Sequence, residues 1–292
     1  MKYLDPKNDL TFKKVFGEHK HLCKSLLNAL LPLSESEQIV DLEYLPAELV
    51  PEIPIVKNTI VDVRCVDANG RQFIVEMQMY WTPSFMQRVL FNASKAYVKQ
   101  LDKKQEYNLL QPVYALSLVD DIFDDSSDAY YHHYKIGNTE DAGQNMEGLE
   151  FVFVELPKFK PNSITEKKIT ALWLRYLTEI NDDTTNIPFE FSEHEEITEA
   201  IECIRESAFS KRELDYYDKY WDQVRVERTI MVDAEKKGVE IGLVQGEIIG
   251  IKKGEALAIG KIVRSLKNND TPLDQIIRIT GLSKEEISEL LQ

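Results

Sequence analysis

The sequence has little cysteine and no long uninterrupted run of apolar residues. Three cysteines occur in 292 residues, and Cys23, Cys65 and Cys203 are too far apart to predict a disulfide framework or a cysteine-rich metal site. No apolar run approaches the length of about twenty residues that a transmembrane helix needs. The first residues, MKYLDPKNDL, also lack the apolar core of a signal peptide. We therefore expect a cytoplasmic protein without a membrane partner.

Positive charge is scarce relative to negative charge. The chain carries 35 Lys and Arg residues against 50 Asp and Glu residues, which gives a net charge of −15. Such acidity disfavours nucleic acid as a partner. The excess is confined to residues 116–292, which hold 21 basic and 36 acidic residues, whereas residues 1–115 hold 14 of each. A polyanion would therefore meet the N-terminal part of the chain more readily than the rest.

Apolar spacing predicts an α/β core in the first half of the chain. A short helix is expected from Asp9, a good N-cap residue, to Gly17. Further helices are predicted over 21–31 and 84–104, and strands over 38–45, 57–67, 71–80, 112–119, 129–135 and 149–157. From 164 to about 265 the pattern is mostly helical. We therefore expect three regions, comprising residues 1–160, 161–230 and 231–292.

Glycines recur every four residues from Gly238 to Gly254, in a segment whose pattern is otherwise helical. Each glycine destabilises a helix by about 1 kcal/mol relative to alanine, so we expect this helix to need a partner. The last segment predicts two short helices separated at Gly281, with Ser283 and Glu286 as a capping box. That helix pair either reads DNA or serves in packing, and its net negative charge favours packing. We therefore predict that residues 231–292 support a homodimer.

The segment VDVRCVDANGRQFIVEMQ predicts a β-hairpin whose register follows from its turn. A three-residue loop, Ala68–Gly70, suits a type I turn followed by glycine in the left-handed region, and it places Asp67 opposite Arg71. One face of the hairpin is then wholly apolar, formed by Val61, Val63, Cys65, Phe73, Val75 and Met77. A loop of two or four residues would instead place polar side chains on that face. The odd loop therefore predicts that Asp62 lies directly opposite Glu76.

Two carboxylates that face each other across adjacent strands repel one another. A divalent cation would turn this repulsion into ligation. Asp62, Glu76 and the backbone carbonyl of Met77 would form an open half-shell of the kind that Mg²⁺ completes with waters and phosphate oxygens. The alternative is that these residues form an ordinary solvated face of the hairpin. Apolar residues such as Val66 and Ile74 on the same face favour a partly covered cleft, but the residues alone leave both interpretations open.

Four phrases follow one another along the chain: DLTFKKVFG, YLPAELVPE, IVDVRCVDANGRQFIVEMQ and PVYALSLVD. In this order they are similar to the Rpn family of recombination-promoting nucleases and transposases, within the PD-(D/E)xK nuclease superfamily. The resemblance covers about residues 1–160. It implies an α/β fold with a restriction-endonuclease-like core, in which helices flank a mixed central sheet. A mainly α-helical C-terminal region is expected to follow this core.

The resemblance also implies an activity, the hydrolysis of phosphodiester bonds by a Mg²⁺-dependent DNA endonuclease in which Mn²⁺ can substitute. Asp62 and Glu76 match the metal ligands of the superfamily, with the carbonyl of Met77 as a third ligand. Gln78 stands where the superfamily usually has lysine. As the third catalytic residue it would orient the attacking water by hydrogen bonds, without the positive charge that lysine supplies.

Some members of the superfamily place an acidic residue of the first helix near the metal. Asp9 and Glu18 are the residues of this chain that the resemblance offers for such an outer role, although Asp9 is also the predicted N-cap. Either residue would lie near the metal but outside its direct ligands.

Basic residues on two predicted helices are candidates for contacts to DNA phosphates. They are Lys13, Lys14, Arg88, Lys95 and Lys99. A solvated basic stripe is the alternative for each of them. Two other functions also stay open, namely a catalytically degenerate nuclease-like module that binds DNA or protein, and an interaction protein that binds no nucleic acid. Metal binding tests the first alternative, and salt-dependent DNA binding tests the second.

Overall fold

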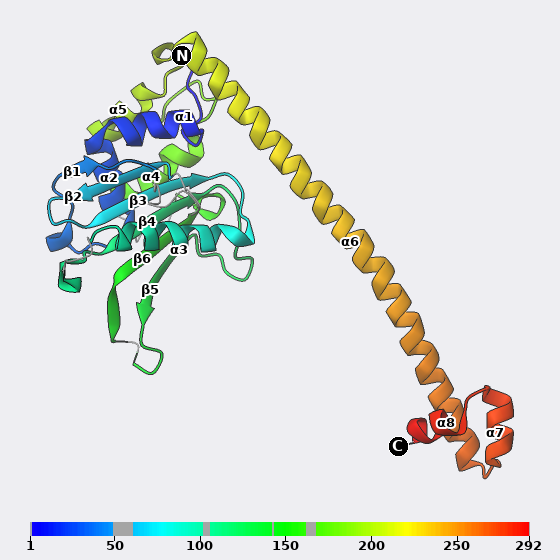
Figure 1. Cartoon of the computed structure of the whole chain (residues 1–292). Coiled ribbons are helices and arrows are strands. Elements are labelled where there is room, and N and C mark those ends of the chain that lie inside the picture. The colour runs from blue at the N-terminus through cyan, green and yellow to red at the C-terminus, as the bar shows by residue number, and fades with distance from the viewer. Residues whose placement is uncertain (1, 49–60, 102–105, 142, 162–167, 292) are drawn as a thin grey trace. The chain divides into compact units, whose positions relative to one another are not determined.

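The computed structural model describes residues 2–48, 61–101, 106–141, 143–161 and 168–291. Packing divides the chain into two units, Met1–Arg225 and Val226–Gln292. The first unit contains a six-stranded sheet with helices on both faces, and the second contains most of one long helix and two short ones (Figure 1). Residues 161–225 therefore share a unit with residues 1–160.

The sheet of the first unit is mixed. Its strands are β1 (Leu42–Tyr44), β2 (Val63–Asp67), β3 (Gln72–Gln78), β4 (Val113–Val119), β5 (Tyr131–Gly137) and β6 (Asn145–Glu155). They lie in the order β1-β2-β3-β4-β6-β5, with β4 parallel to both of its neighbours and the other pairs antiparallel. The predicted mixed α/β core is thus confirmed. The part of the predicted strand 57–67 that precedes residue 61 lies outside the described residues.

The first helix, α1 (Asp9–Phe12), continues directly into a π-helix, η1 (Lys13–Gly17). The other helices of this unit are α2 (Lys20–Leu30), α3 (Pro83–Val98), α4 (Lys168–Glu179), α5 (Glu195–Cys203) and the start of α6 (Lys211–Asn268). Among the described residues, the first unit also contains five short 3₁₀ helices: η2 (Glu35–Glu37), η3 (Tyr107–Leu109), η4 (Leu156–Lys158), η5 (Phe189–Glu193) and η6 (Glu206–Ala208).

Asn8, and not Asp9, is the N-cap of α1. The Oδ1 atom of Asn8 accepts a hydrogen bond from the N–H of Leu10 at 3.0 Å. The prediction of Asp9 as N-cap is wrong because Asn8, an equally good capping residue, directly precedes it. Asp9 becomes the first helical residue, and its carboxylate lies 2.6 Å from the ammonium of Lys13 one turn further on.

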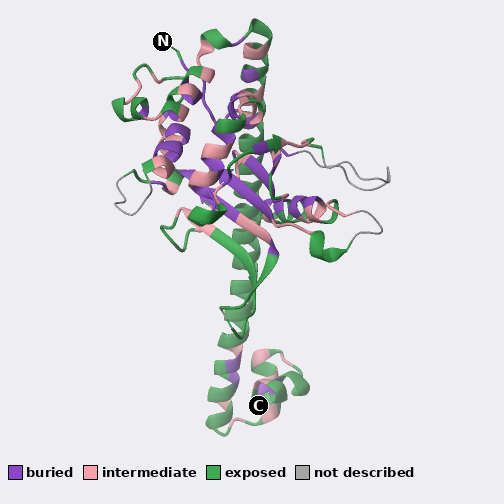
Figure 2. Ribbon diagram, turned by 90° about the vertical axis from the view of Figure 1, so that its left-hand side faces the viewer, coloured by how far each residue is buried: buried purple, intermediate pink, exposed green. Residues whose placement is uncertain are grey.

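Different helices cover the two faces of the sheet. On one face, η1, α2, α4 and α5 enclose an aromatic cluster that includes Phe16, Trp173 and Tyr176. On the other face, α3 packs its buried side, including Phe85 and Val89, against β3, β4 and β6. Figure 2 shows the buried residues concentrated in the strands and in the helices beside them. Helix α3 therefore covers the side of β3 that carries Glu76.

The β2–β3 hairpin has the predicted register. Val63 pairs with Val75, and Cys65 pairs with Phe73. Gly70 closes the three-residue loop in the left-handed region, with φ of 83°, and such a conformation strains any residue with a Cβ atom. The predicted three-residue loop is thus confirmed.

Two residues before β2, Val61 and Asp62, depart from the predicted hairpin pattern. Val61 is buried with Ile74 and Phe85 on the α3 side of the sheet, whereas Val63 belongs to the opposite core. The chain bends at Asp62 before β2 begins, so the alternation of the strand does not extend back to residue 61. Asp62 therefore lies outside the ladder and is not the strand partner of Glu76 that the register predicted; its side chain accepts a hydrogen bond from the N–H of Met77 instead.

The second unit gathers three helices around a small apolar centre. The end of α6, which is 58 residues long in total, packs against α7 (Leu273–Thr280) and α8 (Lys284–Leu291) through Val263, Ile276 and Ile287. Ser283 and Glu286 form the predicted reciprocal capping bonds at 2.8 and 3.2 Å. Across the part of the chain that the structure describes, no helix combines the length and the apolar character needed to cross a bilayer.

Candidate active site

Asp62 and Glu76 come together where β2 begins and β3 nears its end. The Oδ2 atom of Asp62 accepts a hydrogen bond from the backbone N–H of Met77 at 2.8 Å. Because the N–H and C=O groups of one strand residue point to the same edge, the carbonyl of Met77 faces the edge where Asp62 lies. The sequence-predicted metal ligands, Asp62, Glu76 and Met77, are thus neighbours in space.

Burial makes both carboxylates costly to ionise. The pKa of Asp62 is raised to about 6, mainly by burial; the N–H of Met77 and the ammonium of Lys13 oppose the shift, and the negative charges of Glu76 and Asp9 add to it. Burial also raises the pKa of Glu76, against the hydrogen bond from Asn92 and the charge of Arg88. The pair therefore gains from a nearby cation.

Two polar atoms without a partner flank Glu76. Asn92, on α3, donates from Nδ2 to Oε1 of Glu76 at 3.0 Å, while Ser117 is the neighbour of Glu76 on β4. The Oδ1 atom of Asn92 and the Oγ atom of Ser117 are buried and have no hydrogen-bond partner among the described residues. Buried polar groups of this kind commonly bind ordered water. The surroundings of Glu76 are therefore suited to a hydrated ligand.

Asn92 and Ser117 were not among the residues predicted from the sequence. For Asn92 a signal was present, because Arg88 and Asn92 are four residues apart on one helix and share a face. For Ser117 the only signal was a hydroxyl in the otherwise apolar strand PVYALSLV.

Each carboxylate has one cation beside it, and each cation comes from a helix. Lys13 Nζ, on η1, lies 3.8 Å from Oδ1 of Asp62. Arg88 Nη2, on α3, lies 3.8 Å from Oε2 of Glu76. The two cations bracket the carboxylate pair from opposite faces of the sheet.

Gln78 is held by the protein at both ends of its amide. The amide nitrogen donates to the carbonyl of Tyr80 at 2.7 Å, and the amide oxygen accepts from Arg88 at 2.6 Å. Arg88 thereby connects Gln78 to Glu76. The amide nitrogen keeps a second hydrogen that it can offer to a ligand.

Of the two candidates for an outer role, only Asp9 lies near the pair. Its Oδ1 contacts Lys13, and its Oδ2 accepts a hydrogen bond from Oη of Tyr216 on α6 at 3.2 Å. Glu18 is exposed and lies close to Tyr44 and Cys203, whose pKa values are raised mainly by burial, with a smaller contribution from the charge of Glu18. Glu18 is not among the groups whose charge affects the pKa of Asp62 or Glu76.

The predicted DNA-contacting lysines point to different places. Lys14 is turned toward the start of α6, where Nζ donates to the carbonyl of Ala208 at 2.9 Å. Lys95 lies over the ring of Phe91 on the outer side of α3, and Lys99 is the C-cap of that helix. Of the five predicted residues, Lys13 and Arg88 are the two that contact the carboxylates, at Asp62 and Glu76 respectively.

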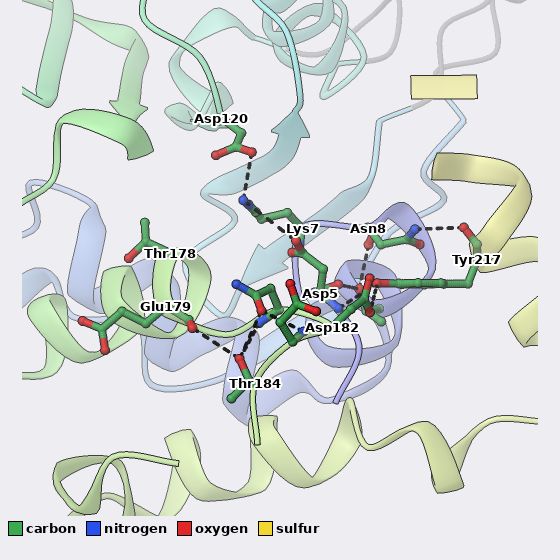
Figure 3. A network of polar contacts seen from close by, with 12 residues as sticks. Asp5, Lys7, Asn8, Asp120, Thr178, Glu179, Asp182, Thr184 and Tyr217 are labelled. Carbon is green, nitrogen blue, oxygen red and sulfur yellow. Dashed lines mark hydrogen bonds and ion pairs between the residues drawn. The ribbon is translucent and has the colours of Figure 1, made fainter. Parts of the chain in front are cut away.

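A second polar network adjoins the site at the end of β4 (Figure 3). Lys7 Nζ contacts Oδ2 of Asp120 at 2.9 Å and Oδ2 of Asp5 at 3.9 Å. The backbone N–H of Asp120 donates to the carbonyl of Gln78 at 2.8 Å, which joins the network to the end of β3. Burial raises the pKa of Asp5 to about 6, and the charge of Lys7 opposes this shift. None of these contacts was predicted, and those of Asp120 with Lys7 and Gln78 join segments far apart in the sequence.

The donor set fits an open magnesium site. No group of three or more Asp, Glu, His or Cys side chains with metal-binding geometry occurs among the described residues. The site instead offers two carboxylates and a carbonyl. Mg²⁺ is usually bound by one or two carboxylates, with waters and substrate phosphates as its other ligands, so the two carboxylates present are sufficient.

The whole site lies within a segment of the chain that matches a known protein family. A family described as "PD-(D/E)XK nuclease family transposase" matches residues 6–231. The chain belongs to this nuclease family. Neither the curated proteins nor the solved structures yielded a match to the chain.

Membership of the PD-(D/E)XK nuclease family confirms the resemblance and the fold class expected from the sequence. It makes the protein a nuclease-type hydrolase in general terms, and it implies DNA as the substrate. Nucleases of this family generally use divalent metals. The match extends beyond residue 160 into α6, the helix from which Tyr216 contacts Asp9.

Proposed function

We propose that the protein is a metal-dependent DNA endonuclease whose active site is the Asp62–Glu76 pair. The observation that carries the proposal is that Asp62 accepts a hydrogen bond from the N–H of Met77, the residue after Glu76, and lies within reach of the negative charge of Glu76. Both carboxylates have pKa values raised by burial, as expected for side chains that are stabilised by a bound cation.

Asp62, Glu76 and the carbonyl of Met77 would hold Mg²⁺, or Mn²⁺ in its place. When bound, the ion supplies positive charge to the phosphate and lowers the pKa of a coordinated water. Gln78 is our candidate for orienting the attacking water through the second hydrogen of its amide nitrogen. Arg88 keeps that amide in place.

The reaction is an addition of water to phosphorus. The water oxygen forms a new P–O bond, one P–O ester bond of the DNA breaks, and the products are a phosphate monoester and a hydroxyl group. The attacking water loses one proton to solvent, and the leaving ester oxygen takes up one proton from solvent to become the hydroxyl group. The residues of the chain bind the phosphate, orient the water and stabilise negative charge on the phosphate oxygens.

The basic side chains of α3 suggest a path for the DNA. Arg88 lies at the site, and Lys95 and Lys99 follow along the same helix, about 10 to 16 Å further on at 1.5 Å per residue. We propose that they contact phosphates on one side of the cleaved bond. A homodimer is part of the same proposal, because two sites are needed to cut both strands.

The second candidate function is a catalytically degenerate module that binds DNA without cleaving it. The observation that favours it is the uncharged Gln78, whose amide is already bound by Tyr80 and Arg88. Such a module would bind DNA in a salt-dependent manner but would hold no metal.

Nicking of supercoiled plasmid in Mg²⁺ or Mn²⁺ separates these functions. We expect the wild type to nick, Asp62→Asn to lose the activity, and Glu43→Gln, an exposed carboxylate change on β1, to retain it. A folded wild type that binds plasmid but never nicks it with either metal would refute the endonuclease and leave the degenerate module.

A further inference from the structure

We propose that Lys13 is a catalytic residue of this site and donates a hydrogen bond from its ammonium group to the cleaved phosphate during bond breaking. This inference rests on the proposed function. It assigns to a residue of the first helical segment the positive charge that Gln78 cannot supply. It also separates Lys13 from the lysines that would merely hold DNA.

The ammonium of Lys13 lies beside the carboxylate of Asp62. Nζ is 2.6 Å from Oδ1 of Asp9 and 3.8 Å from Oδ1 of Asp62. An ammonium has three donor hydrogens, and among the described residues only the contact to Asp9 is of hydrogen-bond length. The side chain of Lys13 is 41% exposed and that of Asp62 24%, so a phosphate can approach both from solvent.

The backbone of Lys13 is held rigidly. Its neighbours Phe12 and Phe16 are fully buried in the core under the sheet, with ring centroids 4.8 Å apart. Lys13 opens the π-helix η1, and π-turns in helices are rare and often occur at functional sites. Asp9, one turn earlier, fixes the end of the side chain. The charge is therefore preorganised, which is the condition under which it stabilises a transition state most effectively.

The other cations near the site are less suited to this task. Arg88 donates to Oε1 of Gln78 at 2.6 Å, and the same Nη2 atom is the one close to Glu76. Lys7 is paired with Asp120, and Lys14 points to the carbonyl of Ala208. Lys13 alone of these contacts Asp62 while it remains accessible to a ligand.

Hydrolysis increases the negative charge on the non-bridging oxygens of the phosphate. A fixed ammonium at hydrogen-bond distance from one of these oxygens stabilises the transition state more than the ground state. Removal of one such preorganised donor typically lowers kcat by about 100-fold to 1,000-fold. A residue that only holds the DNA backbone would instead raise KM and leave kcat unchanged.

The experiment measures plasmid or duplex cleavage and Mn²⁺ affinity on the same samples of the full chain. The variants are Lys13→Met, Lys13→Arg, and the double variant Lys13→Met with Gln78→Lys. Lys20→Met, an exposed lysine at the start of α2, is the matched control. Circular dichroism and the unfolding midpoint establish that each variant folds. If Lys13→Met does not fold, the test is made with Lys13→Arg.

We expect Lys13→Met to lower kcat by about 100-fold or more with little change in KM. Its Mn²⁺ affinity should be equal to or higher than that of the wild type, because a cation that competes for Asp62 has been removed. Lys13→Arg should retain part of the rate, since the charge is kept in a different geometry. The double variant should recover activity over Lys13→Met, because the new lysine restores a cation beside the phosphate.

Three outcomes would overturn the inference. If Lys13→Met cleaves at the wild-type kcat, Lys13 is not catalytic, although the endonuclease proposal stands. If Lys13→Met loses Mn²⁺ affinity and cleavage in parallel, Lys13 acts by positioning Asp62. If the wild type itself does not cleave, the proposed function fails and the role of Lys13 fails with it.

Discussion

The backbone N–H of Met77 donates a hydrogen bond to Oδ2 of Asp62 at 2.8 Å, although Asp62 precedes β2 and Met77 lies near the end of β3. This bond continues the hairpin ladder through a side chain at the point where the regular strand pairing stops. It places a carboxylate where a backbone carbonyl would otherwise lie.

Asp62 should make the metal-free protein less stable as the pH rises. The pKa of Asp62 is raised by burial from 3.8 to about 6 in the folded state. The folded chain therefore holds this proton more tightly than the unfolded chain, and the free energy of unfolding falls as pH rises from about 4 to about 7. Asp62→Asn should remove this loss. It should raise the free energy of unfolding by up to about 3 kcal/mol at pH 8 and change it little at pH 4.

Chemical unfolding in a metal chelator at pH 4 and pH 8 measures this effect. Glu43→Gln, an exposed change on β1, serves as the control and should shift neither curve. Equal stability of wild type and Asp62→Asn at pH 8 would show that the Asp62 carboxylate is not destabilised by burial.

Asn92 should determine the pH at which the site binds metal. Its hydrogen bond to Glu76 lowers a pKa that burial raises. Asn92→Leu removes that bond, so the pKa of Glu76 should rise further and Mn²⁺ binding should require a higher pH. Ser117→Ala removes a buried hydroxyl that has no protein partner and should leave the pH profile near that of the wild type. An unchanged profile in Asn92→Leu would contradict the account of Glu76.

Lys7 should stabilise the fold through its two buried carboxylate partners. Its Nζ lies 2.9 Å from Asp120 and 3.9 Å from Asp5, and all three side chains are largely buried. Lys7→Met leaves both negative charges without their cation. The free energy of unfolding should therefore fall by about 3 kcal/mol at pH 8. The loss should shrink near pH 4, because Asp5, with a pKa of about 6, is then protonated. Urea unfolding at the two pH values tests this, and a pH-independent loss would count against it.

The long helix α6 should mediate the homodimer if one forms. Ile241, Val244, Ile248 and Ile251 are all exposed and follow one another at spacings of three and four residues, the spacing of a coiled-coil seam. Sedimentation equilibrium should show a dimer that Val244→Glu with Ile248→Glu dissociates, while Lys252→Glu does not. A monomeric wild type at micromolar concentration would contradict this prediction.

The hairpin and the helix after it could be predicted because their signals are local. The loop Ala68–Gly70 and the alternation of β2 and β3 fix the register within a short stretch, and the register places Asp62 near Glu76. Helix α3 and strand β4 likewise follow from apolar spacing and from β-branched residues.

The remaining parts of the site depend on contacts between distant segments. The approach of Lys13 to Asp62 requires the first helix to pack on the sheet edge, which periodicity alone does not specify. The choice of Asn8 over Asp9 as the cap turns on one hydrogen bond between adjacent, equally suitable residues. The pairing of His132 with the fully buried Glu155 at 3.0 Å, across β5 and β6, also has no sequence signal.

The most direct test of the central claim is a Mn²⁺ titration of the full chain at pH 8, followed by electron paramagnetic resonance. We predict binding in the wild type and in Glu43→Gln, and loss of that binding in both Asp62→Asn and Glu76→Gln, with all four proteins folded. A wild type that binds no Mn²⁺, or an Asp62→Asn variant that binds it as tightly as the wild type, would show that the paired carboxylates are not the metal site.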